Sequence, residues 1–243
     1  MDSIVAPTTI FHITQYKAGS QWVYNILLKC APDRIVKPKL WAAQFLKDPI
    51  IVGAIYPTVY VTKRLFDRTK KPENTSYFVV LRDLRDTAVS AYFSLKLSHP
   101  TMGSAEKIRR KLNSRDLEDG LLWILKNWLS INAKICSSWV ESDEHWIRYE
   151  DLLVNDSMIL EEVLLKKCLL DVEMETFRKA VSSCRFESLS QGRKRGEEDV
   201  SSHVRKGIAG DWRNYFTPKV KKFFKQRYGD LLVRSGYEKN DQW

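Results

Sequence analysis

The most constraining feature of this chain is a short apolar run near the N-terminus that passes through a small basic turn into a helical pattern. Residues 9–14 are β-branched and apolar, which is typical of a buried strand. The turn and the first helical residues are Lys17, Ala18, Gly19, Ser20, Gln21 and Trp22. A junction of this kind directs backbone N–H groups and one cation toward a common point. The sequence therefore predicts a phosphate cradle here.

Two further segments have the same character. Residues 76–82 are predicted to form a buried strand that ends in Arg82, and Ser90 follows about a turn into the next helical pattern. An arginine fork and a serine hydroxyl can converge on one anion. Near the C-terminus, a segment with two cations precedes a glycine whose N–H can approach a phosphate closely. This segment begins with Arg205, Lys206 and Gly207. Three anion sites predict a ligand with several anionic groups.

The set of motifs resembles the family of sulfotransferases that use 3′-phosphoadenosine 5′-phosphosulfate (PAPS). The family's 5′-phosphosulfate loop, 3′-phosphate strand-helix and C-terminal nucleotide loop match residues 16–23, 76–90 and 205–212. A fourth match begins at Tyr149, in Tyr-Glu-Asp-Leu. The resemblance implies one domain over residues 1–243 with the P-loop-kinase-like sulfotransferase fold. It also implies transfer of a sulfuryl group to a hydroxyl or amine of a small-molecule or saccharide acceptor, with release of adenosine 3′,5′-bisphosphate (PAP).

The resemblance also assigns roles. Lys17 corresponds to the family lysine that lies against the oxygen bridging sulfur and the 5′-phosphate, and Trp22 and Tyr149 match adenine-contacting positions. The alternative for these two aromatic residues is a place in the core. The remaining expected nucleotide contacts are Ala18, Gly19, Ser20, Gln21, Arg82, Ser90, Arg205, Lys206 and Gly207. No metal ion is implied, because the chain lacks a Gly-Lys-Ser/Thr Walker loop and the family's reaction needs no magnesium.

The chain departs from the family pattern at several positions. Tyr16 and Leu84 stand where proline is usual, and Gln21 stands where threonine is usual. We expect these changes to be tolerated, because the phosphate is held chiefly by backbone groups. The C-terminal dimer signature is broken around Pro218. The sequence therefore leaves the oligomeric state open.

The family's catalytic base, a histidine in a Lys-Thr-His segment, is missing. The corresponding residues 55–63 contain no histidine. His99 is the leading substitute, because it resembles a position that lines the acceptor pocket. The remaining candidates are Tyr56 and Tyr60, which are expected to contact the acceptor, His12, which is expected in the core, and His145 and His203, which have little to recommend them.

The positive charge of the chain makes other classes of function worth considering, beginning with nucleic-acid binding. The formal net charge is +10 and the pI is about 9.4, but the basic residues are dispersed and no zinc finger or basic-region signature is present. We therefore expect no nucleic-acid partner. A small-molecule kinase that uses ATP is the alternative enzyme, disfavoured by the missing Walker lysine. A basic module that binds polyanions is the non-enzymatic alternative, favoured by charge alone.

The sequence also bears on localisation. It has no apolar run of about 18 residues, the length that spans a membrane. Residues 1–7 lack the basic and apolar parts of a signal peptide. Four cysteines lie far apart without metal-ligand spacing, which favours free thiols in a reducing compartment. They are Cys30, Cys136, Cys168 and Cys184. We expect a cytoplasmic protein with no membrane partner.

The order of the patterns predicts an α/β fold. The β-rich runs lie at residues 8–14, 50–55, 76–82 and 145–149, with helical patterns between them. This alternation predicts a parallel sheet flanked by helices on both faces. Further helices are expected over residues 117–139, 159–170 and 218–233. The polar segment 188–199 is expected to be a surface loop, either a lid over the nucleotide or a plain solvated loop.

Overall fold

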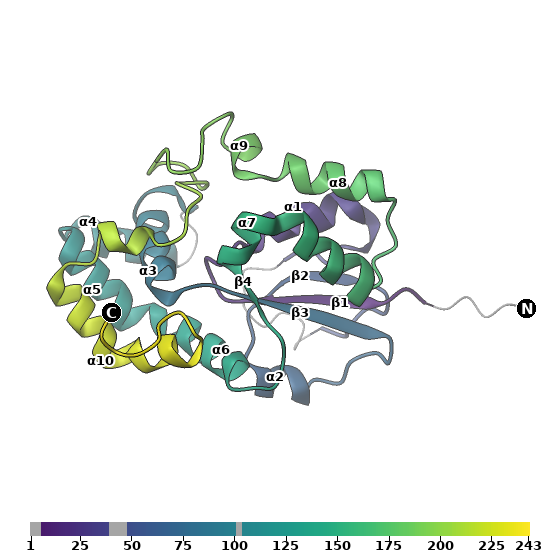
Figure 1. The fold of residues 1–243 in the computed structure, drawn as a ribbon, viewed down its shortest axis with the longest axis horizontal. Helices are drawn as coiled ribbons and strands as arrows, with labels where there is room; N and C mark the ends of the chain where they lie inside the picture. Colours follow the sequence, from purple (N-terminus) through teal and green to yellow (C-terminus); the bar gives the residue numbers. More distant parts are fainter. Residues whose placement is uncertain (1–5, 39–47, 101–103) are drawn as a thin grey trace, which may run out of the picture.

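The computed structural model describes residues 6–38, 48–100 and 104–243, and its centre is one four-stranded parallel sheet (Figure 1). The strand order is β2-β1-β3-β4. The strands are β1 (Thr9–Thr14), β2 (Ile55–Val59), β3 (Thr75–Leu81) and β4 (Ile147–Arg148). The predicted α/β class with a parallel sheet is therefore confirmed. Residues 1–5, part of the segment considered for a signal peptide, lie outside the described ranges.

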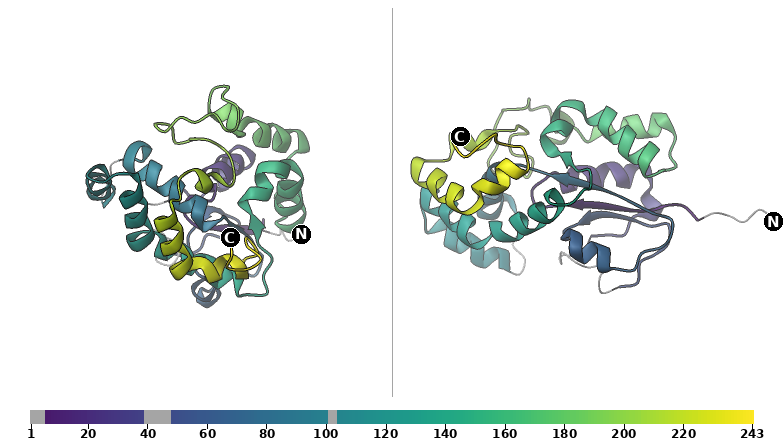
Figure 2. Two further views of the ribbon diagram at one scale, coloured as in Figure 1. Left: turned by 60° about the vertical axis from the view of Figure 1, so that its left-hand side comes forward. Right: turned by 60° about the horizontal axis from the view of Figure 1, so that its bottom comes forward.

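Helices cover both faces of the sheet, as Figures 1 and 2 show. Ile10 and Val80 point to the face packed by α1, α7 and α8, whereas Phe11 and Leu81 belong to the second core, with α3, α5, α6 and α10. Successive residues of a strand point to opposite faces, so each strand contributes to both cores. The helices are α1 (Ser20–Cys30), α2 (Lys63–Arg68), α3 (Leu84–Phe93), α4 (Ser104–Asn113), α5 (Leu117–Asn127), α6 (Leu129–Val140), α7 (Tyr149–Leu160), α8 (Met174–Ser183), α9 (Phe186–Leu189) and α10 (Pro218–Arg234).

The strand predicted at 50–55 is wrong in position. Gly53 has φ +75°, and its N–H donates to Thr9 Oγ1 at 2.9 Å, so the chain turns before the strand begins at Ile55. β2 includes Pro57, which lacks the N–H that a central strand would need. β2 lies at the edge of the sheet, where a missing donor is tolerated. Because a proline is not typical of a strand, the sequence pattern did not indicate a strand at these residues.

Several helix boundaries also differ from expectation. The helix predicted over 117–139 is divided into α5 and α6 at Trp128, whose φ is −117°. The strand predicted over 145–149 is only two residues long, because α7 begins at Tyr149. α7 occupies the start of the predicted 159–170 helix and continues as a π-helical stretch to Lys167. The helix predicted at 218–233 is confirmed as α10.

The segment predicted as a surface loop at 188–199 consists of the end of α9 followed by turns and irregular backbone. It leads to residues 200–210, and Figure 1 shows this stretch passing from α9 to the helices around α3. The stretch thus joins helices on the two sides of the sheet. Among the described residues, no helix combines the length and apolarity that crossing a membrane requires.

Candidate active site

A cavity of about 380 Å³ lies at the carboxyl end of the sheet. Each strand is followed within two residues by a residue that lines it, namely Tyr16, Tyr60, Arg82 and Tyr149. The carboxyl ends of parallel strands are the usual place for a ligand in open α/β sheets. The other expected site residues that line the cavity are Lys17, Gly19, Ser20, Gln21, Trp22, Ser90, His99, Arg205, Lys206 and Gly207. Ala18 is fully buried and does not line it.

The turn between β1 and α1 has the backbone of an anion-binding loop. Lys17 has φ +67° and Gly19 has φ +80°, both in the left-handed region. A Cβ atom at position 19 would lie 2.8 Å from the Tyr149 ring, so only glycine fits. α1 begins at Ser20 without a side-chain cap or an acidic residue in its first turn. Its first N–H groups and the positive end of its dipole are therefore available to an anion.

Lys17 is placed among other cations. Its backbone carbonyl accepts a hydrogen bond from Arg82 Nη1 at 2.9 Å. Burial, together with the positive charges of Arg82 and Arg205, lowers the pKa of the Lys17 ammonium to about 8. A group held in this electropositive position stabilises negative charge strongly once an anion enters. Lys17 lines the cavity, and its predicted place at the reacting end of the ligand stays a prediction.

Arg82 connects two of the predicted motifs. It directly follows β3, its side chain is buried, and its guanidinium lies 4.5 Å from the centroid of the Tyr149 ring. Gln15 Nε2 donates to the Arg82 carbonyl at 3.0 Å, which fixes the backbone at the end of the strand. Among the described residues, the buried Nε of Arg82 has no hydrogen-bond partner. An unpartnered buried guanidinium N–H in a cavity fits an anionic ligand such as a phosphate.

The C-terminal motif reaches the same cavity. Gly207 has φ +66°, and a side chain at this position would collide with the Phe186 ring. The side chains of Arg205 and Lys206 both pair with Asp211, the latter at 2.7 Å. Asp211 therefore holds these two cations beside the Gly207 backbone. Asp211 belongs to the matched motif 205–212, but the sequence analysis assigned no role to its carboxylate.

Asp86 joins the second and third motifs. Its carboxylate accepts hydrogen bonds from the backbone N–H groups of Gly210 at 2.7 Å and of Trp212 at 2.9 Å. Charge-assisted bonds of this kind are stronger than neutral ones. The first turn of α3 is thereby attached to the loop that carries Arg205 and Gly207. The 3′-phosphate motifs predicted separately form one structural unit.

Trp22 and Tyr149 lie together on one wall of the cavity. Their rings meet edge to face with centroids 6.2 Å apart and an interplanar angle of 86°. Both side chains are partly exposed rather than buried in the core. Among the described residues, the buried Trp22 Nε1 has no hydrogen-bond partner. A flat aromatic surface with a free N–H donor fits a purine ring.

His99 and His203 lie in the lining of the cavity. His99 Nδ1 is 2.9 Å from the Pro100 carbonyl, which can only accept, so Nδ1 carries the hydrogen and Nε2 holds the lone pair. Partial burial of the His203 ring in the lining, followed by the charges of Lys17 and His99, lowers its pKa to about 4. The place of His203 in this lining could not be predicted from the sequence, because the segment that carries it has no periodic pattern.

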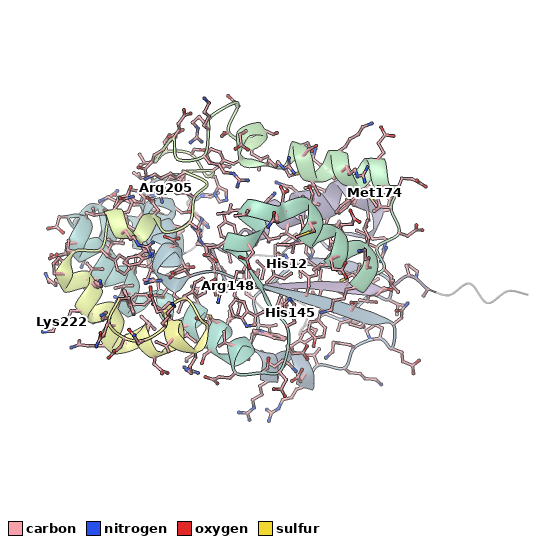
Figure 3. The ribbon with its side chains drawn as sticks, viewed as in Figure 1. His12, His145, Arg148, Met174, Arg205 and Lys222 are labelled. Carbon is pink, nitrogen blue, oxygen red and sulfur yellow. The ribbon has the colours of Figure 1, made fainter. Side chains whose placement is uncertain are left out.

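The other candidates for a base lie elsewhere. His12 is fully buried, its Nδ1 is 2.6 Å from the Pro57 carbonyl, and burial lowers its pKa to about 4. It is a packed core histidine, as predicted. Tyr56 is buried against Phe11, with ring centroids 4.7 Å apart, and does not line the cavity. Figure 3 labels His145 well apart from Arg205, and His145 does not line the cavity either.

The described residues contain no group of three or more His, Cys, Asp or Glu side chains placed to hold a metal ion. The cavity is instead lined by cations, backbone N–H groups and aromatic rings. The expected nucleotide carries two phosphate groups and a purine. The free N–H groups of Arg82 and Trp22 are donors that match such a molecule.

Comparisons with known proteins agree with this geometry. The family model described as the sulfotransferase domain matches residues 57–236. The chain is 23% identical over 258 residues to mouse (Mus musculus) sulfotransferase 1 family member D1, covering 91% of this chain and 82% of that protein. It is 27% identical over 250 residues to sulfotransferase 1B1 of the dog (Canis lupus familiaris), covering 87% and 79%.

Solved structures show the same fold. The mouse sulfotransferase SULT7A1 complexed with PAP superposes with a TM-score of 0.64 at 19% identity, covering 95% of this chain and 85% of that one. Retinol dehydratase in complex with retinol and PAP superposes with a TM-score of 0.54 at 15% identity, covering 94% and 82%. Identities at this level establish similarity of fold.

Proposed function

The chain belongs to the sulfotransferase domain family, and on that premise we propose that its cavity binds PAPS and transfers the sulfuryl group to a small hydroxyl or amine acceptor. PAP is then the released product, as it is the nucleotide bound in the similar mouse sulfotransferase. The observation that carries this proposal is that two sets of anion-binding groups line one cavity. One set lies at the start of α1, and the other surrounds Arg82. An ATP-binding P-loop needs only the first.

The 5′-phosphosulfate end is assigned to the β1–α1 turn. The N–H groups of Gly19, Ser20, Gln21 and Trp22 and the Ser20 hydroxyl hold the 5′-phosphate, with Ala18 supporting them from its buried position. Lys17 lies beside the oxygen on which negative charge develops during transfer. Its ammonium stabilises that charge, and positioning and electrostatics supply most of the catalysis in a reaction of this kind.

The 3′-phosphate end is assigned to the unit that Asp86 holds together. Arg82 offers a guanidinium with an unpartnered N–H, and Gly207 offers a backbone N–H. The hydroxyl of Ser90 and the cations of Arg205 and Lys206 complete this set. Trp22 and Tyr149 hold the purine between the two ends.

His99 is proposed as the general base. Because Nδ1 donates to the Pro100 carbonyl, the lone pair on Nε2 is free to accept the proton of the acceptor. His99 and Lys17 line the same cavity. The acceptor attacks the sulfuryl group while the base removes its proton. The base and the sulfuryl group must therefore both lie close to the bound acceptor.

The acceptor is proposed to be a small organic molecule rather than a macromolecule. Retinol dehydratase, a structural neighbour, has been solved with retinol and with androsterone. Both ligands are small alcohols, and the tyrosine rings of Tyr16 and Tyr60 give this cavity an aromatic wall. The four cysteines are free thiols, which fits the proposed cytoplasmic location.

The experiment is a transfer assay with sulfur-labelled PAPS and a panel of phenols, aliphatic alcohols and amines. We expect label to move to at least one acceptor without added magnesium, together with stoichiometric PAP. A parallel assay uses γ-labelled Mg-ATP and the same panel. Phosphoryl transfer from ATP without sulfuryl transfer from PAPS would support the kinase and contradict this proposal.

A further inference from the structure

Tyr60 makes a long-range contact with the turn that holds the 5′-phosphate. It directly follows β2 and lines the cavity. Its phenol Oη donates a hydrogen bond to Ser20 Oγ at 2.9 Å. The ring of Tyr16 stacks on the Tyr60 ring with centroids 4.0 Å apart and an interplanar angle of 13°. The hydroxyl is therefore held in place from one side by a stacked, immobilised ring.

The direction of this hydrogen bond decides what Ser20 can do. A serine hydroxyl has one proton to donate and two lone pairs that accept. Both groups are hydroxyls, so when an anion accepts the serine proton, Tyr60 is the donor of this bond and occupies a lone pair of Ser20 Oγ. Burial raises the pKa of the Tyr60 phenol, against a smaller lowering by its hydrogen bond with Ser20, so the phenol keeps the proton that it can donate. Among the described residues, Ser20 Oγ donates to no other group.

Ser20 is also the first residue of α1, and it lines the cavity beside Gly19. A free O–H at a helix N-terminus that faces an anion site adds a directed donor to the backbone N–H groups. Without Tyr60, this hydroxyl would rotate among several orientations. Ordering it when the nucleotide binds would cost conformational entropy and weaken the binding.

We propose that Tyr60 is a positioning residue that orients the Ser20 hydroxyl toward the 5′-phosphate of the nucleotide. This role rests on the proposed function, because it requires the β1–α1 turn to bind that phosphate. It gives residues 55–63, which lack the histidine of the family pattern, a different part in the site. In this role the Tyr60 hydroxyl acts through Ser20 and not on the acceptor.

The test is a double-mutant cycle on nucleotide affinity, which needs no acceptor. Titration calorimetry measures the affinity for PAP in the wild type, Tyr60→Phe, Ser20→Ala and the double variant. We expect Tyr60→Phe to weaken PAP binding about 3- to 10-fold and Ser20→Ala about 10-fold, as for hydrogen bonds to a charged group. The double variant is expected to bind within about twofold of Ser20→Ala, because the two residues act as one unit.

Adenosine 3′-monophosphate, which lacks the 5′-phosphate, is the discriminating ligand. Its affinity is expected to be the same in the wild type and in Tyr60→Phe, which also shows that the variant keeps a folded site. Tyr24→Phe makes the same chemical change on α1 at a residue that does not line the cavity, and is expected to bind PAP like the wild type.

Three results would overturn this role. If wild-type protein bound PAP but Tyr60→Phe bound it equally well, or if the losses of the two variants multiplied, Tyr60 would not act through Ser20. If the wild type failed to bind PAP, the proposed function itself would be wrong, and the role of Tyr60 would be wrong with it. A loss of turnover with unchanged PAP affinity would assign Tyr60 to the acceptor instead.

Discussion

Replacing His99 with alanine is expected to lower turnover by about 10²- to 10⁴-fold, the usual contribution of a general base. His99 lines the cavity together with Lys17, and its Nδ1 donates to Pro100, so Nε2 is the atom that accepts a proton. The PAP affinity of the variant is expected to stay unchanged, because His99 is placed on the acceptor and not on the nucleotide.

His203→Ala is the matched comparison, because His203 lines the same cavity. The lowered pKa of His203, about 4, keeps that imidazole neutral throughout the usual assay range. If His203 were the base, the loss of turnover would follow His203→Ala, and the wild-type rate would fall only as the pH approaches about 4. Near-normal rates in His99→Ala, on an aliphatic alcohol as well as on an acidic phenol, would remove His99 from the mechanism.

Replacing Lys17 with alanine is expected to lower turnover by about 10²- to 10³-fold, which is typical when a preorganised charge-stabilising group is removed. PAP affinity is expected to stay within a few-fold, because the backbone N–H groups of α1 and the Arg82 site still bind the two phosphates. Single-turnover kinetics with PAPS and calorimetry with PAP separate the two effects. Lys29→Ala, on the exposed last turn of the same helix, is the control.

The pH dependence gives Lys17 a second signature. Because its pKa is lowered to about 8 in the free protein, the ammonium is present below that pH and is lost as the pH rises through it. The kcat/KM for PAPS reports groups of the free enzyme. It is expected to fall above about pH 8 in the wild type and to show no such limb in Lys17→Ala. Full turnover in Lys17→Ala would show that this lysine has no catalytic part.

The sequence identified those parts of the site that depend on local backbone pattern. The strand-turn-helix at Lys17 and Gly19 and the strand that ends at Arg82 were predicted from periodicity and turn residues, and both line the cavity. These elements can be predicted because a buried strand and a glycine turn each have a recognisable sequence pattern. They also predicted the parallel sheet correctly.

Contacts between distant residues were beyond the sequence pattern. Asp86 binds Gly210 and Trp212, and Tyr60 binds Ser20 across 40 positions, and neither pair has a spacing that reports contact. The place of His203 in the cavity lining could not be predicted either, since a loop without periodicity does not indicate which way it folds. Only tertiary packing brings these groups to the carboxyl end of the sheet.

The central claim, that the cavity binds a 3′,5′-bisphosphate nucleotide, is tested most directly by titrating PAP and Mg-ATP separately into the wild type and into Arg82→Ala. We predict that the wild type binds PAP more tightly than Mg-ATP. Arg82→Ala is predicted to lose about 2–3 kcal/mol of PAP binding, because a charge-assisted contact to the 3′-phosphate disappears. Arg110→Ala, at an exposed site on α4, is predicted to bind like the wild type. Equal or tighter binding of Mg-ATP, or unchanged PAP binding by Arg82→Ala, would contradict the account.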